Sequence, residues 1–350
     1  MKKIWQRYLL RQIGTTFLFI LICLFVVFIL LDFSIHGVRF LKRGATDGID
    51  IFIYYFRLFA MHLELFLPLT FLLTTLKVLF DLNHHFELVA LQMAGLSRKT
   101  LLRPFFLFAA LLSLVCYINS QWFAPDAILS AQTFKTLHSK TKKRAPRSPL
   151  QSIALPDDSE LVYQSFDAEK QELFDVFWVR SSEDIWHMKF LRIDISPPQG
   201  HFIDHLIRKE RLEKSESFDA RPFPELPMNP DTKPKAFIPF ESRSLTTLLH
   251  EAIYASSNKA SVRTHLQYKL ALPLLSLLGL LAIAPLTMRF SRDRPTLLIV
   301  ALSLFGFLAL KTLFDSLLIL GENQVLPSWV AMWLPLLALF AYSIKRFAKL

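Results

Sequence analysis

Five ionisable residues fall inside apolar stretches of the sequence, where a charge is costly unless it has a partner. His62, Glu64 and Lys77 lie in one such stretch, and Lys311 and Asp315 lie in another. Lys311 and Asp315 are four residues apart, so they can pair on one face of a helix. Two roles are open for these side chains: they stabilise the packing of helices, or they line a polar path through a membrane.

The sequence does not predict a chain that hydrolyses a nucleotide or binds a metal. A nucleotide-binding loop needs a glycine followed by lysine, and none of the nine glycines has that neighbour. His84, His85 and Glu87 are close in sequence but lack the spacing of a zinc site. No pattern of Ser, His and acid predicts a hydrolase. We therefore predict no catalytic residues, no metal and no cofactor, and any ATP hydrolysis must come from a partner chain.

The composition indicates a membrane protein. Of the 350 residues, 53% are hydrophobic and 33 are phenylalanine, a larger apolar share than soluble proteins usually have. Crossing a bilayer takes roughly 20 apolar residues. Six apolar runs are candidates for this: residues 13–31, 58–79, 104–122, 270–288, 296–318 and 329–343.

Basic residues predict the orientation of these spans. They concentrate at the amino terminus, in the loops after the second and fourth spans, and at the carboxyl terminus. Because Lys and Arg favour the cytoplasmic side of a membrane, both termini are predicted to be cytoplasmic. The formal net charge of +11 is then a consequence of topology, and nucleic-acid binding is not predicted.

Residues 123–267 are polar and proline-rich, and contain no run long enough to cross a membrane. Period-two alternation over residues 173–179 and 186–195 predicts strands, and a one-residue slip near Leu191 predicts a bulge. The predicted fold is an α-helical integral membrane protein with six transmembrane helices and an all-β domain inserted between helices 3 and 4. The predicted domains are 1–122, 123–267 and 268–350.

Residues 81–98 form an amphipathic stretch between the second and third spans. Five of its apolar residues can share one helical face: Phe86, Val89, Ala90, Met93 and Ala94. Gly95 can end this helix. The helix could lie on the lipid surface or dock into another protein. Glu87 favours docking, since a carboxylate is poorly placed against an anionic cytoplasmic leaflet.

Residues 87–104, ELVALQMAGLSRKTLLRP, follow a span that contains LPLTFLL and precede a span that ends in QWFAPDA. This pattern resembles the lipopolysaccharide-export permeases of the LptF/LptG family, also called the YjgP/YjgQ family. The resemblance continues through LVYQSF and ELFDVFWV into YKLALPLLSLLGLLAIAPL and LPSWVAMWLP. QWFAPDA and the LKR sequence after the first span are slightly closer to LptG.

The resemblance implies one half of an ABC transporter permease in the bacterial inner membrane. It implies a paralogous permease as partner, a cytoplasmic ABC ATPase dimer, and lipopolysaccharide as the substrate. It also implies a periplasmic β-jellyroll that passes lipid to periplasmic bridge proteins, including a single-span membrane component. On this model the residues that couple to the ATPase are Phe86, Glu87, Met93, Gly95 and Ser97.

Arg39, Lys42 and Arg43 follow the first span, on the side where short loops usually avoid basic residues. Arg and Lys suit phosphate, and the family's permeases carry basic residues at this place, so the resemblance implies that these three bind the lipid head group. A solvated loop is the alternative. For the whole chain, the alternative is a membrane-anchored sensor or assembly factor whose outer domain binds a ligand.

Overall fold

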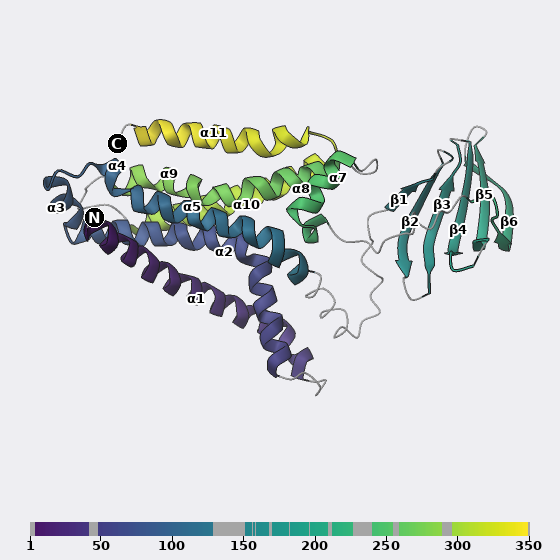
Figure 1. Ribbon diagram of the computed structural model, residues 1–350, viewed down its shortest axis with the longest axis horizontal. Coiled ribbons are helices and arrows are strands. Elements are labelled where there is room, and N and C mark those ends of the chain that lie inside the picture. Colours follow the sequence, from purple (N-terminus) through teal and green to yellow (C-terminus); the bar gives the residue numbers. More distant parts are fainter. Residues whose placement is uncertain are drawn as a thin grey trace. The chain divides into compact units, whose positions relative to one another are not determined.

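The structure is a computed structural model, and the chain folds as two compact units. The structure describes residues 4–41, 48–128, 151–155, 157, 159–167, 170–181, 183–195, 197–208, 212–226, 240–254, 259–288 and 296–348. One unit is helical and comprises Met1–Ser139 with Phe240–Leu350, and the other comprises Lys140–Pro239 and contains the strands (Figure 1). Both boundaries between the two units fall inside the predicted insert, residues 123–267.

Among the described residues, six helical segments are long and apolar enough to cross a membrane, which confirms the six predicted spans. They cover Ile4–Ile35, Ile51–His84, Arg98–Ile128, Lys259–Thr287, Thr296–Glu322 and Ser328–Ala348. Their elements are α1 (Ile4–Leu41), α2 (Gly48–His84), α4 (Arg98–Leu101), α5 (Arg103–Ile118), the π-helical turn η1 (Asn119–Phe123), α8 (Lys259–Ala271), the 3₁₀ turn η4 (Leu272–Leu274), α9 (Leu275–Thr287), α10 (Thr296–Glu322) and α11 (Ser328–Ala348).

Helix α2 connects the two apolar clusters of the helical unit. One cluster joins α2 to α1, α5 and α9, and the other joins it to α8, α9, α10 and α11. Figure 1 shows α2, α5 and α9 side by side. In contrast, the most apolar window of α1 has 0% of its residues buried, and that of α10 has 11%. These two helices therefore offer apolar faces to lipid or to another chain.

The turn η4 interrupts the fourth span at Pro273. Proline lacks an N–H and removes one helical hydrogen bond. Two side chains of α5 donate to carbonyls at this break: the Ser113 hydroxyl to Pro273 O at 2.7 Å, and the Tyr117 hydroxyl to Leu270 O at 2.7 Å. Such partners let a broken helix persist at membrane depth.

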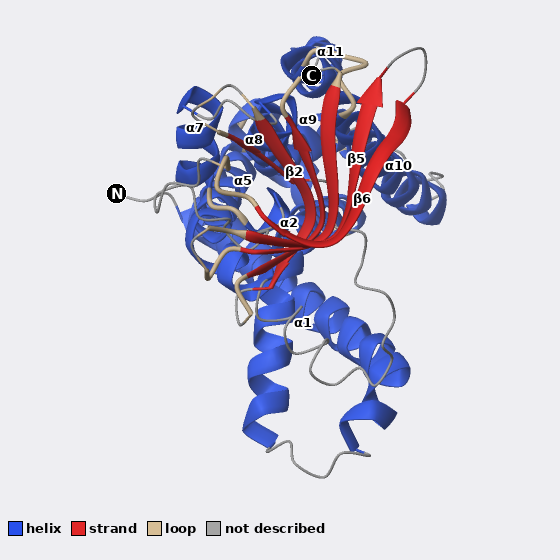
Figure 2. Cartoon of the chain, turned by 90° about the vertical axis from the view of Figure 1, so that its right-hand side faces the viewer, coloured by secondary structure: helices blue, strands red, loops and turns tan. Residues whose placement is uncertain are grey.

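The second unit contains an antiparallel sheet that is strongly curved (Figure 2). Its described strands are β1 (Gln151–Ala154), β2 (Glu160–Asp167), β3 (Glu172–Val179), β4 (Asp184–Arg192), β5 (Gln199–Arg208) and β6 (Leu212–Pro222). Each pairs with the next along the chain, as short connections favour. The β domain is confirmed. The described strands form one meander sheet, and the jellyroll arrangement of the domain stays a prediction.

The apolar alternation changes phase by one residue near Leu191. This change corresponds to a bend of the sheet and not to the predicted bulge. The β3–β4 pairing keeps one register throughout, yet the buried face changes along both strands. Asp175 on β3 and Phe202 on β5 have φ angles of 54° and 51°, in the left-handed region, which turns the strands there. Among the described pairings, a register shift occurs elsewhere, between His205 and Leu206 where β5 pairs with β6.

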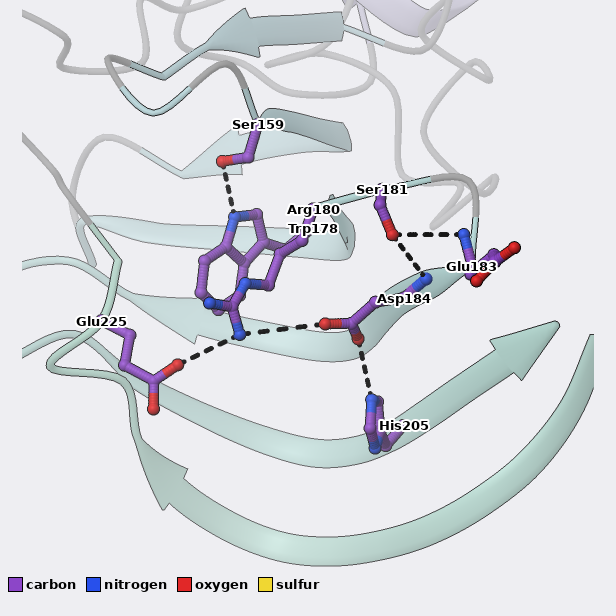
Figure 3. Close-up of polar contacts among 8 residues, drawn as sticks. All are labelled: Ser159, Trp178, Arg180, Ser181, Glu183, Asp184, His205 and Glu225. Atoms are coloured by element: carbon purple, nitrogen blue, oxygen red, sulfur yellow. Dashed lines mark hydrogen bonds and ion pairs between the residues drawn. The ribbon is translucent and has the colours of Figure 1, made fainter.

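A hydrogen-bonded group fixes one end of the sheet (Figure 3). The indole N–H of Trp178, which is 1% exposed, donates to Ser159 Oγ at 2.9 Å. Ser159 in turn donates to Asp157 Oδ1 at 2.6 Å and holds the pKa of that carboxyl below its usual range. Arg180 lies between Asp184 and Glu225, at 3.8 Å and 3.2 Å. Ser159 is thus a buried structural residue.

Candidate functional site

The segment 81–98 is built from three pieces, so the prediction of one helix is wrong. Helix α2 continues to His84, α3 covers Glu87–Met93, and α4 begins at Arg98. Phe86 interrupts the helix between α2 and α3, because its φ of 61° is left-handed. The turn allows buried leucines on both sides of it, Leu82 and Leu88, to enter the same apolar cluster. Tertiary packing decides the local conformation here.

Helix α3 nevertheless exposes the apolar face that the sequence predicts. The exposed fraction is 60% for Phe86 and 84% for Met93. Leu88, on the opposite side, is 2% exposed and packs into the cluster of α1, α2, α5 and α9. The segment is therefore anchored on one side and uncovered on the other. We call the uncovered side the docking surface: Phe86, Val89, Ala90, Met93 and Ala94.

Glu87 lies beside the docking surface and has a partner that sequence reasoning missed. The Tyr8 hydroxyl on α1 donates to Glu87 Oε2 at 3.0 Å. A carboxylate offers several acceptor positions, so Tyr8 orients Glu87 while acceptor capacity is left for a donor on another chain. The two residues are 79 positions apart, and no local pattern relates them.

Gly95 and Ser97 end α3 and begin α4, as predicted for the end of the helix. Gly95 has φ of 86°, and a Cβ built there meets nothing within 4 Å. Glycine is favoured by this backbone conformation and not by lack of space. The Ser97 hydroxyl accepts a hydrogen bond from Thr100 N at 3.2 Å and so caps α4.

Lys311 and Asp315 form the predicted ion pair on α10. The sequence did not reveal that Tyr268 on α8 completes the group. Its hydroxyl accepts from Lys311 Nζ at 2.6 Å and donates to Asp315 Oδ1. Three polar side chains thus satisfy one another between two helices, which supports the packing role that we considered for the pair.

His62 and Glu64 are on α2, and the structure separates their environments. The His62 ring nitrogen Nδ1 lies 3.0 Å from Leu58 O, and its ring packs against Phe28 and Phe66. Glu64 is partly buried and interacts electrostatically with Lys311 and with Lys269, a lysine on α8. His62 is therefore held by aromatic rings, and Glu64 belongs to the charged group around α8.

Lys269 is a buried lysine that the sequence analysis did not select. Its exposed fraction is 6%, and its ammonium donates to Glu241 O at 2.8 Å and to Arg243 O at 2.7 Å. Nearby on α8, His265 pairs with Glu322 of α10. The signal was available, since Lys269 directly precedes the predicted span 270–288, within the predicted domain 268–350.

Arg39, Lys42 and Arg43 are the predicted head-group residues. The described helix α1 includes the backbone of Arg39, whereas its side chain, and all of Lys42 and Arg43, lie outside the described residues. Among the residues that the structure describes, no group of three His, Cys, Asp or Glu side chains could hold a metal ion.

The fold defines a multi-pass membrane protein with a β domain inserted between its third and fourth spans. The model of the family described as lipopolysaccharide export system permease LptF/LptG matches residues 7–349. The chain belongs to this family, and it is a multi-pass protein of the inner membrane. No curated relative matches the sequence. The family model covers both permeases, so the preference for LptG stays a prediction.

Proposed function

We propose that this chain is one of two paralogous permease subunits that extract lipopolysaccharide from the inner membrane by using ATP hydrolysis in a cytoplasmic ABC ATPase dimer. Family membership supports the transport of lipopolysaccharide. The observation that carries the ATPase partnership is the docking surface, an anchored segment whose apolar side chains are uncovered. Apolar anchors next to a charged residue are typical of a protein interface.

Two contacts support the location of the docking surface beside both chain ends. The Tyr8 hydroxyl reaches Glu87 at 3.0 Å, and Lys99 Nζ donates to Ala348 O at 3.2 Å. The basic residues near these ends favour the cytoplasm. On this orientation the docking surface faces the compartment that contains ATP.

The uncovered apolar faces of α1 and α10 support the proposal that a second permease chain binds there. Large apolar side chains on these helices are exposed, among them Phe19 at 70% and Phe305 at 70%. Lipid can cover such faces, but a paralogous partner covers them in a paired permease. The β domain then receives lipid and passes it to bridge proteins in the periplasm, including a single-span membrane component. Binding of the lipid head group is assigned to Arg39, Lys42 and Arg43.

Co-purification separates this proposal from the alternative, a membrane-anchored sensor or assembly factor. The tagged chain, expressed with its native partners, should retain an ABC ATPase whose activity responds to lipopolysaccharide. Glu87→Ala should lower ATPase recovery more than about tenfold if charge-assisted hydrogen bonds of roughly 1.5–3 kcal/mol are lost. Glu183→Ala, at an exposed carboxylate of the β domain, is the matched control. A chain that retains no ATPase, or equal recovery with Glu87→Ala, contradicts the proposal.

A further inference from the structure

Helix α8 approaches α10 closely along its length. A Cβ placed on Gly321 of α10 would lie 2.5 Å from Thr264 Cγ2 of α8, so this crossing requires glycine. One residue further along each helix, His265 pairs with Glu322. Towards the middle of the membrane, Tyr268 bonds to both members of the Lys311–Asp315 pair. Steric contact and three polar interactions therefore fix α8 against α10.

Helix α8 also holds the segment through which the chain returns from the β unit. This segment begins with the 3₁₀ turn η3 (Phe240–Ser242). Lys269 donates to the carbonyls of Glu241 and Arg243, and the Phe240 ring stacks on His265 with centroids 5.3 Å apart. A buried ammonium is stable only with such partners, so the turn and α8 are strongly linked.

The segment that leads from the third span into the β unit contains η1, and it is joined to α8 through α7. Helix α7 (Leu245–Tyr254) packs on α8 through buried Leu248 and Leu266. Gln121 in η1 donates to Thr246 Oγ1 at 2.8 Å and accepts from Thr246 N at 3.2 Å. Asn119, in the same π-helical turn, donates to Ala60 O on α2 at 2.9 Å. The two segments that flank the β unit are thus connected to each other, and through α7 to α8.

We propose that α8 is a rigid connection that transmits movement of α10 to the segments flanking the β unit, and that Lys269 and Tyr268 are the positioning residues that make it rigid. The inference rests on the proposed permease function, in which α10 lies against the second permease and shifts as the ATPase works. Lipid transfer then depends on this connection, whereas assembly with the ATPase and ATP hydrolysis do not.

Distance measurements on the protein with unaltered α8 test the rigidity directly. Spin labels at Leu313→Cys on α10 and Leu249→Cys on α7 occupy exposed positions, at 45% and 52%, in a chain whose native cysteines are replaced. Their distance distribution should be the same with and without ATP in the reconstituted complex. A second pair, Leu313→Cys with Leu18→Cys on α1, should change. A change in the first pair as large as in the second overturns the proposal.

Substitution tests the consequence for transport. Lys269→Met removes both hydrogen bonds to η3 and should lower lipopolysaccharide transfer at least roughly fivefold, the lower range of coupling between sites. ATPase assembly and basal hydrolysis should stay within about twofold of wild type. Lys269→Arg, which keeps a charged donor, should recover transfer, and Lys345→Met on α11 is the control for loss of an exposed lysine.

Transfer at the wild-type rate in Lys269→Met contradicts the proposal. If that variant does not insert, Tyr268→Phe decides, because it removes only the hydroxyl between α8 and the Lys311–Asp315 pair. Its transfer should fall while hydrolysis persists, and equal transfer overturns the proposal. Failure of the unsubstituted chain to assemble with an ATPase is a different result, and it would reject the proposed function itself.

Discussion

Replacing Gly95 tests whether backbone conformation positions the docking surface. Gly95 has φ of 86° and open space around its Cβ position, so Gly95→Ala adds conformational cost without a clash. That cost is about 1–2 kcal/mol for an L-residue in the left-handed region. Gly14 is a matched control, because it lies inside α1 and also has nothing within 4 Å. Gly14→Ala should stabilise the helix by about 0.5–1 kcal/mol.

If the turn relaxes to avoid this cost, the docking conformation becomes roughly 5- to 30-fold less populated. The apparent affinity for the ATPase then falls by the same factor. Gly95→Asn should lose less, since Asn tolerates the left-handed region. Titration of the ATPase onto the permease in lipid nanodiscs measures these affinities. Wild-type affinity for Gly95→Ala, or equal losses for Ala and Asn, would refute the conformational argument.

Three further predictions concern topology, acid stability and the basic cluster. In a chain without native cysteines, an impermeant thiol reagent should label Ser215→Cys on intact spheroplasts and spare Ala94→Cys; the reverse would invert the proposed orientation. The Lys214 ammonium, together with a hydrogen bond from Ser217, lowers the pKa of the Asp204 carboxyl. The contribution of ionised Asp204 to stability is therefore full above the unfolded pKa of about 3.9, and it is lost as the pH falls through the lower folded pKa. We would measure the protection of the β5–β6 amides against hydrogen exchange, corrected for intrinsic rates. As the pH falls through that window, protection should decrease less steeply in Asp204→Asn than in the wild type. Identical pH profiles would exclude a contribution of Asp204 ionisation to stability. Glutamine should replace the three basic residues Arg39, Lys42 and Arg43. Lipopolysaccharide crosslinking should then fall in a salt-dependent way without loss of the ATPase, and unchanged crosslinking would support a solvated loop.

Features that depend on local pattern were predictable. Apolar length predicts each span, and the four-residue spacing of Lys311 and Asp315 predicts their pairing, because both follow from helix geometry. Gly95 was predicted to end the helix because glycine readily adopts the left-handed conformation at which helices end. The exposed face of α3 also follows from sequence, since residues three and four apart share a side.

Features that depend on distant partners were not predictable. The fourth span begins at Lys259, well before the apolar run, because the partners of His265 and Lys269 allow polar residues to continue the helix into the membrane unit. Tyr8 and Glu87 meet only after α1 packs beside α2 and α3. The left-handed turn at Phe86 likewise results from packing on both of its sides. A single sequence contains no local signal for such contacts.

Site-specific photocrosslinking from Met93 tests the central claim most directly, namely that the docking surface binds the ATPase. A photoreactive amino acid at Met93, which is 84% exposed, is compared with one at Leu297 on α10, which is also 84% exposed. The account predicts that the crosslinker at Met93 captures the ABC ATPase and that the one at Leu297 captures lipid or membrane protein. Crosslinks from Met93 to lipid alone would contradict it and would place α3 on the membrane surface.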